Sequence, residues 1–150
     1  GGICRAVTTR DLNGWDTHQN NNTQGRLHQN LFNALRTLAA DLERAGIFDD
    51  TLVVVLSEMS RTPKLNEQQG KDHWPVTSAL AFGGGLRGNR VIGQTDDLVN
   101  AVPVDMSTGT ADEGGLPIQP KNLAAGLLQV AGADPAPYFP GIDPLTALES

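Results

Sequence analysis

Leucines recur at every third or fourth position along residues 24–45, which places them on one face of an amphipathic helix. Thr23, just before this stretch, has the chemistry of an N-cap, and Gly46, just after it, suits a C-terminal stop. A shorter helix is predicted for residues 120–131, because Pro120 fits the first helical position and apolar residues follow at helical spacing.

Three apolar stretches have the length and composition of strands. Residues 51–56 are continuously apolar and valine-rich, which is typical of a central strand covered on both faces. Residues 3–12 precede the long helix, and residues 76–82 follow later in the chain. A strand, a long helix and a second buried strand indicate a parallel crossover unit. We therefore expect an α/β domain with a mainly parallel sheet flanked by helices.

The rest of the chain is expected to be irregular. Residues 57–75 are polar and aperiodic, which indicates a long functional loop. Residues 88–115 are rich in glycine and aspartate, with short strands expected around 91–92 and 102–104. The proline-rich tail after the second helix is expected to lie on the surface. No internal repeat or linker divides the chain, so residues 1–150 are interpreted as one domain or part of one.

Composition narrows the class of function. The 150 residues are 39% hydrophobic, which suits one domain with a core. The formal net charge is -6 and no basic run is present, so a nucleic-acid partner is not expected. The longest apolar run is strand-sized, so no membrane span is expected. Cys4 is the only cysteine and has no internal disulfide partner. Because the chain opens Gly-Gly without Met, we interpret it as a fragment, which leaves export open.

A candidate metal site begins in the segment Gly-Trp-Asp-Thr-His at residues 14–18. Asp16 and His18 are two positions apart, so in an extended backbone they point to the same side. Glu58 follows the apolar run 51–56, and His73 lies in the long loop. Ligands of open α/β sheets bind beyond the carboxyl ends of strands, so we predict that these four residues converge on a divalent ion. Zinc fits this ligand set best, with calcium, manganese or iron as alternatives.

Each of these fragments also has a simpler interpretation. Asp and His are common turn residues that hydrogen-bond the backbone. Glu58 is close enough in sequence to form a local ion pair with Arg61, and His73 could simply pack against Trp74. Arg61 is either a planar clamp for an oxyanion or an ordinary surface arginine. His28 lies off the leucine stripe and is expected to be a solvated helix residue.

The same segments resemble a known family. Gly-Trp-Asp-Thr-His-Gln-Asn-Asn at 14–21, Thr-Leu-Val-Val-Val-Leu-Ser-Glu at 51–58, Arg-Thr-Pro-Lys-Leu-Asn-Glu at 61–67, Asp-His-Trp-Pro at 72–75 and Gly-Gly-Gly at 83–85 are similar to the DUF1501 family. That family is bacterial and uncharacterised, and is related to the alkaline phosphatases and sulfatases. The resemblance implies an alkaline phosphatase-like fold, of which this chain would be the C-terminal part. It also implies an upstream nucleophile and a periplasmic or cell-surface location.

The resemblance also assigns site residues. Asp16 and His18 resemble a metal-ligand pair of the superfamily, and His73 resembles its later ligand histidine. Glu58 stands at the strand end where relatives carry ligands, but Met59 replaces the second ligand found there in the phosphatases.

The function expected from these features is metal-dependent hydrolysis of small sulfate or phosphate esters, with Arg61 as the candidate catalytic residue that clamps the anion. The alternative is a non-catalytic binding or structural protein whose ion stabilises the fold.

Overall fold

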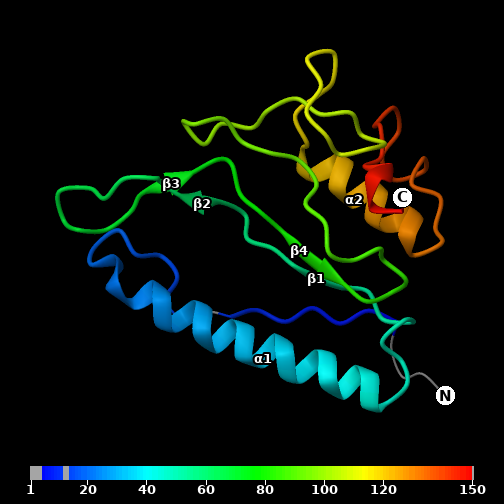
Figure 1. Cartoon of the computed structure of the whole chain (residues 1–150), viewed down its shortest axis with the longest axis horizontal. Coiled ribbons are helices and arrows are strands. Elements are labelled where there is room, and N and C mark those ends of the chain that lie inside the picture. Colours follow the sequence, from blue (N-terminus) through cyan, green and yellow to red (C-terminus); the bar gives the residue numbers. More distant parts are fainter. Residues whose placement is uncertain (1–4, 12–13, 150) are drawn as a thin grey trace.

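The computed structural model describes residues 5–11 and 14–149, and Figure 1 shows their arrangement. The described elements, in chain order, are the 3-10 turn η1 (Asn21–Thr23), helix α1 (Gln24–Arg44), strands β1 (Val53–Val55), β2 (Ser60–Arg61), β3 (His73–Trp74) and β4 (Leu80–Phe82), helix α2 (Pro120–Val130) and the 3-10 turn η2 (Thr146–Leu148).

Helix α1 occupies almost the whole stretch predicted from the leucine spacing and ends where glycine was expected to end it. Gly46 has a φ of 69°, a left-handed conformation that glycine adopts without steric cost. Its N–H donates to the carbonyl of Glu43 at 3.0 Å, and the N–H of Ile47 donates to the carbonyl of Leu42 at 3.0 Å. These two bonds form a Schellman closure, which satisfies carbonyls at the end of the helix.

The start of α1 differs from the prediction. Thr23 makes no side-chain capping bond. The turn η1 precedes the helix, and Asn20, in front of that turn, accepts a hydrogen bond from the N–H of Asn22 through its side chain. Thr23 stands at the N-cap position as predicted, but the capping side chain is that of Asn20, because η1 moves the first unpaired N–H groups upstream.

The four strands form one long antiparallel arm. Val53 of β1 lies opposite Phe82 of β4, and Ser60 of β2 lies opposite Trp74 of β3. The register shifts by one residue between the two ladders. The chain folds back at residues 62–72, which we call the outer loop and which lies at the far end of the arm from β1 and β4 (Figure 1). Within the described residues no third strand joins either ladder.

The predicted α/β fold with a mainly parallel, alkaline phosphatase-like sheet is therefore wrong for the described residues. β1 and β4 lie inside the predicted strands 51–56 and 76–82, but they run in opposite directions because the chain between them turns back on itself. Residues 5–11 form no strand, so no parallel crossover surrounds α1. The remaining residues of that first predicted strand, 3–4 and 12, lie outside the described residues. The expected strands at 91–92 and 102–104 are reduced to two isolated bridges of Val104, with Ala111 and with Leu116.

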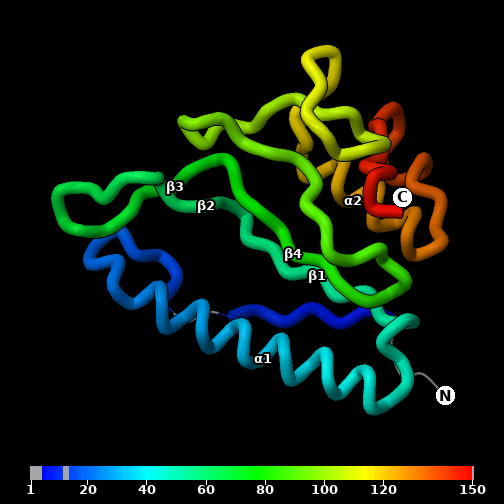
Figure 2. The backbone as a smooth tube through the Cα atoms, viewed as in Figure 1, coloured from blue at the N-terminus to red at the C-terminus, as the bar shows by residue number. Residues whose placement is uncertain are grey.

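A well-packed apolar core surrounds α2. This helix begins at Pro120 as predicted and ends before Gly132. The proline-rich stretch 133–144 is mostly exposed, as expected, but the end of the tail returns across α2 (Figure 2). Its last apolar residues pack against the helix, which the sequence did not predict. The buried side chains of this tail have exposed fractions of 9% or less: Leu145, Ala147 and Leu148. The side chains of α2 that pack on them are Leu123, Leu127 and Val130.

The leucine stripe of α1 is buried less evenly. Leu27 and Leu42 are buried near its ends, whereas Leu38 between them is 41% exposed. The whole chain exposes 10742 Å² of surface, against roughly 7,300 Å² for a compact monomer of 15.9 kDa. Neither described helix combines the length and the apolar content that crossing a bilayer requires.

Candidate metal centre

The side chains of residues 16–18 point in two directions. Thr17 is 7% exposed, and its hydroxyl faces the start of α1, where it donates to Asn21 Oδ1 at 2.8 Å and accepts from Gln24 Nε2 at 2.9 Å. Asp16 and His18 instead bring their ligand atoms together, 3.2 Å apart. The prediction that these two side chains share one side of the backbone is confirmed.

The outer loop holds this segment through its backbone. Three backbone hydrogen bonds of 2.8 to 3.2 Å join residues 17–21 to residues 68–71. Gly70 lies directly against the segment: a Cβ atom at this position would be 2.0 Å from the carbonyl oxygen of His18, closer than any real contact. The close approach of the two segments, which fixes the position of His18, therefore depends on glycine at position 70.

Asn66 fixes the shape of the outer loop and ties it to the site. Its Oδ1 accepts from the N–H groups of Gln68 at 3.0 Å and Gly70 at 2.9 Å. These two contacts set the orientation of the amide, so Nδ2 is free to donate to the carbonyl of His18 at 3.0 Å and to Asp72 Oδ1 at 3.2 Å.

The hairpin of β2 and β3 places Arg61 beside His73. The two residues are directly opposite in the antiparallel register, so their side chains leave the same face. The guanidinium of Arg61 donates through Nη1 to the carbonyl of Lys71 at 3.1 Å and through Nη2 to Asp16 Oδ1. The ion pair formed by Arg61 is thus with Asp16, 45 positions away, and not the local one with Glu58 that the sequence offered as a simple alternative.

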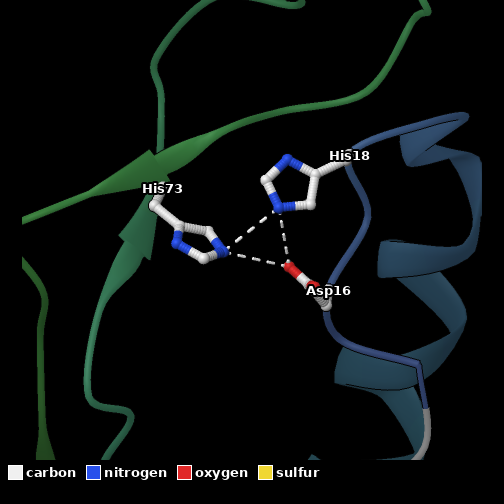
Figure 3. Close-up of side chains that lie close together, drawn as sticks. All are labelled: Asp16, His18 and His73. Carbon is white, nitrogen blue, oxygen red and sulfur yellow. Dashed lines mark hydrogen bonds and ion pairs between the residues drawn. The ribbon is translucent and has the colours of Figure 1, made fainter.

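Three ligand atoms form a nearly equilateral triangle, shown in Figure 3: His18 Nε2, His73 Nε2 and Asp16 Oδ1 are 3.2 Å from one another. Zinc bonds of 2.0–2.2 Å at tetrahedral angles place neighbouring ligand atoms about 3.3–3.5 Å apart. The triangle is therefore close to the size of one face of a zinc tetrahedron. The side chains are about half exposed, at 44% for His18 and 50% for His73, so solvent reaches the centre.

The donor chemistry of the triangle discriminates among the ions expected from the sequence. Two imidazoles and one carboxylate are the ligands of several catalytic zinc sites, in which a fourth position stays open. The same set also suits iron, and manganese binds such nitrogen-rich sites more weakly than zinc. Calcium takes six to eight oxygen ligands and fits poorly here. The residues present thus fit zinc best.

Two carboxylates contact the imidazoles of the centre, Asp16 inside the triangle and Asp72 on the far side of His18. The hydrogen bond from Arg61, followed by that with His73, lowers the pKa of Asp16 below its ordinary value of 3.8. The hydrogen bond with His18, followed by that with Asn66, lowers the pKa of Asp72 below the same value. Both carboxyl groups are therefore ionised at neutral pH and face the imidazoles.

The remaining predicted residues lie outside the triangle. Glu58 is exposed and is not part of it; in the described part of the chain the triangle is the only group of three His, Cys, Asp or Glu ligand atoms within 4.8 Å of one another. Trp74 donates its indole N–H to the carbonyl of Val99 at 2.8 Å, while His73 lies against His18. His28 is exposed on α1, as expected.

Asp72 is a residue of the site to which sequence reasoning gave no role. Its Oδ1 lies 2.9 Å from His18 Nδ1, on the side of the imidazole away from the triangle. The available signal was its place in the Asp-His-Trp-Pro segment, directly before His73. That signal is misleading, because Asp72 serves the other histidine, 54 positions away, and spacing along the chain does not reveal this contact.

Comparison with known proteins identifies the family to which the chain belongs. The family model described as "Protein of unknown function (DUF1501)" matches residues 5–141, which include every residue of the centre described above. No curated protein and no solved structure matches the chain.

Proposed function

Since this chain belongs to DUF1501, a family of unknown function, we propose from the centre itself that the protein is a metal-dependent hydrolase of phosphate or sulfate esters. The observation that carries the proposal is the 3.2 Å triangle of Asp16, His18 and His73 with the guanidinium of Arg61 bound to the same carboxylate.

The residues of the centre have distinct roles in this proposal. Asp16, His18 and His73 would hold a divalent ion, most favourably zinc, which supplies positive charge to the oxygens of the ester group. Arg61 adds a second positive group at the same place. Its planar fork has five N–H donors, and the contacts with Asp16 and the Lys71 carbonyl leave others for an anionic oxygen. Two neighbouring positive groups favour a substrate with an anionic tetrahedral group over a neutral ester.

We further propose that the centre is related to those of the alkaline phosphatases and sulfatases. The support is the order of the ligands, with Asp and His two positions apart and a second His later in the chain. The sheet contributes no support, because its strands are antiparallel. Glu58 as a fourth ligand, and a periplasmic or cell-surface location, stay predictions.

A second candidate function has one observation in its favour. The triangle joins Asp16 and His18, next to α1, to His73 on the arm, more than fifty positions away. A bound ion would tie these two segments together whether or not any chemistry follows. The rival is therefore a binding or structural protein in which the ion stabilises the fold.

The two functions are separated by zinc binding and ester hydrolysis measured on the same proteins. We expect the protein, expressed together with the upstream nucleophile that the family resemblance implies, to bind about one zinc ion and to hydrolyse p-nitrophenyl phosphate or p-nitrophenyl sulfate. Asp16→Ala and His73→Ala remove ligands and should weaken zinc binding by at least about 100-fold, with loss of hydrolysis. His28→Gln is the matched control, because it removes the histidine that lies outside the triangle.

The hydrolase and the structural protein predict different results in this experiment. Hydrolysis that survives both alanine substitutions contradicts the proposed activity. Zinc binding that stabilises the wild-type protein, with no hydrolysis of either ester, supports the structural rival.

A further inference from the structure

We propose that Asp72 is a positioning residue of the metal centre, which holds His18 in the tautomer that presents an unprotonated Nε2 to the ion. This inference rests on the proposed metal site, but the tautomer itself can be measured without metal.

A neutral imidazole carries a single proton, and the partner of each nitrogen decides which one holds it. Asp72 Oδ1 lies 2.9 Å from His18 Nδ1, and an ionised carboxylate only accepts hydrogen bonds. Nδ1 must then carry the proton, which leaves Nε2 with its lone pair. Figure 3 shows that Nε2 is the nitrogen directed at Asp16 and His73, and that Nδ1 points away from them.

The carboxylate of Asp16 competes with that of Asp72 for the proton of His18. Asp16 Oδ1 lies 3.2 Å from His18 Nε2 and would accept a proton from that nitrogen. An Nε2–H would point into the triangle and block it for a cation. Two features favour Asp72 in this competition: its contact with the imidazole is shorter, and the oxygen of Asp16 is already bound by the guanidinium of Arg61. Without Asp72, the proton should move to Nε2.

Hydrogen bonds to its backbone and to its side chain hold Asp72 in place. Its Oδ1 also accepts from Asn66 Nδ2 at 3.2 Å. Its N–H donates to Thr62 Oγ1 at 3.2 Å, and its carbonyl accepts from the N–H of Thr62 at 2.9 Å. The carboxylate is therefore oriented from its backbone and from its side chain. The dipeptide Asp72-His73 then serves both imidazoles, since one residue orients His18 and the next is a ligand itself.

A carboxylate behind a ligating histidine fixes the ring and makes its free nitrogen a better ligand, and its loss typically weakens metal binding 10- to 100-fold. Two substitutions separate orientation from simple structural support. Asp72→Ala removes the acceptor. Asp72→Asn keeps a carbonyl oxygen where Asn66 donates, so this oxygen should still accept from His18 Nδ1. His18, Asn66, Glu67, Gln68 and Asp72 line one open hollow of the surface. Glu67→Gln is the control, because it removes an exposed carboxylate of this hollow that is not placed against His18 Nδ1.

The tautomer is read first, by long-range ¹H–¹⁵N correlation spectra of metal-free protein labelled at histidine, at pH 8. We expect an unprotonated Nε2 on His18 in the wild type, in Asp72→Asn and in Glu67→Gln, and a protonated Nε2 in Asp72→Ala. A protonated Nε2 in the wild type, or an unchanged tautomer in Asp72→Ala, overturns the inference. The wild-type spectrum alone decides the matter if the alanine variant does not fold.

Zinc affinity is read second, by titration calorimetry. We expect Asp72→Ala to weaken zinc binding about 10- to 100-fold, Asp72→Asn to weaken it less, and Glu67→Gln to leave it unchanged. Equal zinc affinity in Asp72→Ala and wild type overturns the positioning role. If no form binds zinc, the proposed function fails, and the spectra still decide which nitrogen of His18 carries the proton when Asp72 is present.

Discussion

At the scale of single residues, one oxygen of Asp16 meets three partners. Oδ1 accepts from Arg61 and lies 3.2 Å from the Nε2 atoms of His18 and His73. The side chain is 67% exposed, and the hydrogen bonds with Arg61 and His73 lower its pKa. A cation in the triangle must share this carboxylate with Arg61, which weakens cation binding but places a guanidinium where an anionic substrate would need it.

The lowered pKa of Asp16 predicts how acid changes stability. Because the folded-state pKa lies below the ordinary value of 3.8, the contribution of this carboxylate is fully present above that value and is lost as pH falls through the folded-state pKa. We expect Asp16→Asn to be less stable than wild type at about pH 5, and the difference in stability to shrink as pH falls through and below 3.8. Urea unfolding at a series of pH values measures it.

Arg61→Gln provides the companion measurement, because Arg61 is the main cause of the shift. It should reproduce the acid-dependent difference in stability, and the double variant should add little to either single change. A difference in stability that widens as pH falls from about 5 to about 3 would contradict the assignment.

Residue-level prediction from sequence succeeded where the geometry is local. The alternation that brings Asp16 and His18 together spans three residues and follows from the period of two along an extended backbone. Glu58 was predicted from its place at a strand end, which presumed a parallel sheet that the described residues do not form. Asp72 was missed because its partner is brought close only by the outer loop.

At the scale of elements, the site depends on how closely the outer loop approaches residues 17–21. Gly70→Ala would place a methyl group against the backbone of His18, and the backbone cannot yield as a flexible side chain can. We expect a loss of about 1–3 kcal/mol in the free energy of unfolding, together with weaker zinc binding, since His18 would be displaced from His73. Thermal unfolding and zinc titration measure the two effects.

Gly25→Ala is the matched control for this change. Gly25 lies in α1 and its added methyl group would meet nothing within 4 Å. Alanine there should raise stability by up to about 1 kcal/mol, because it is the better helix former. Gly70→Ala with unchanged stability and unchanged zinc affinity would show that the two segments are not held as closely as described.

Helices were more predictable than strand pairing, for a physical reason. The leucine spacing of α1 and the Pro120 start of α2 are local signals, and each describes a hydrogen-bonding pattern completed within the element. A valine-rich run such as β1 indicates a strand, but its backbone partners come from elsewhere in the chain. The hydrophobic run therefore located β1 without giving the direction of its neighbour.

At the scale of the whole molecule, packing is uneven. The part of the molecule around α2 has a core that includes fully buried Ala147. The residues of β1, in contrast, are only partly buried, and Leu38 of α1 is 41% exposed. The total exposed surface exceeds the value for a compact monomer by roughly 3,400 Å². Composition alone predicted a compact domain, and it could not reveal this, because apolar content does not determine how completely each apolar face is covered.

Zinc should stabilise the whole molecule through the triangle. Free zinc at 100 times its dissociation constant adds about 2.7 kcal/mol if the unfolded chain does not bind it. For a chain of this length, that corresponds to a rise of about 5–10 °C in Tm. Calorimetry with zinc, and again after EDTA, measures the shift. His73→Ala should abolish it and His28→Gln should retain it; an equal shift in all three proteins would place zinc elsewhere.

The contact between the imidazoles of His18 and His73 closes a ring of chain 55 residues long. Ring closure of that length costs an entropy equivalent to about 3.5 kcal/mol by the logarithmic scaling for flexible chains. Because α1 and the arm shorten the path between residues 18 and 73, we expect this contact to close after they have formed. The triangle is therefore expected to form late in folding. Its formation would then report that the chain between residues 18 and 73 has folded.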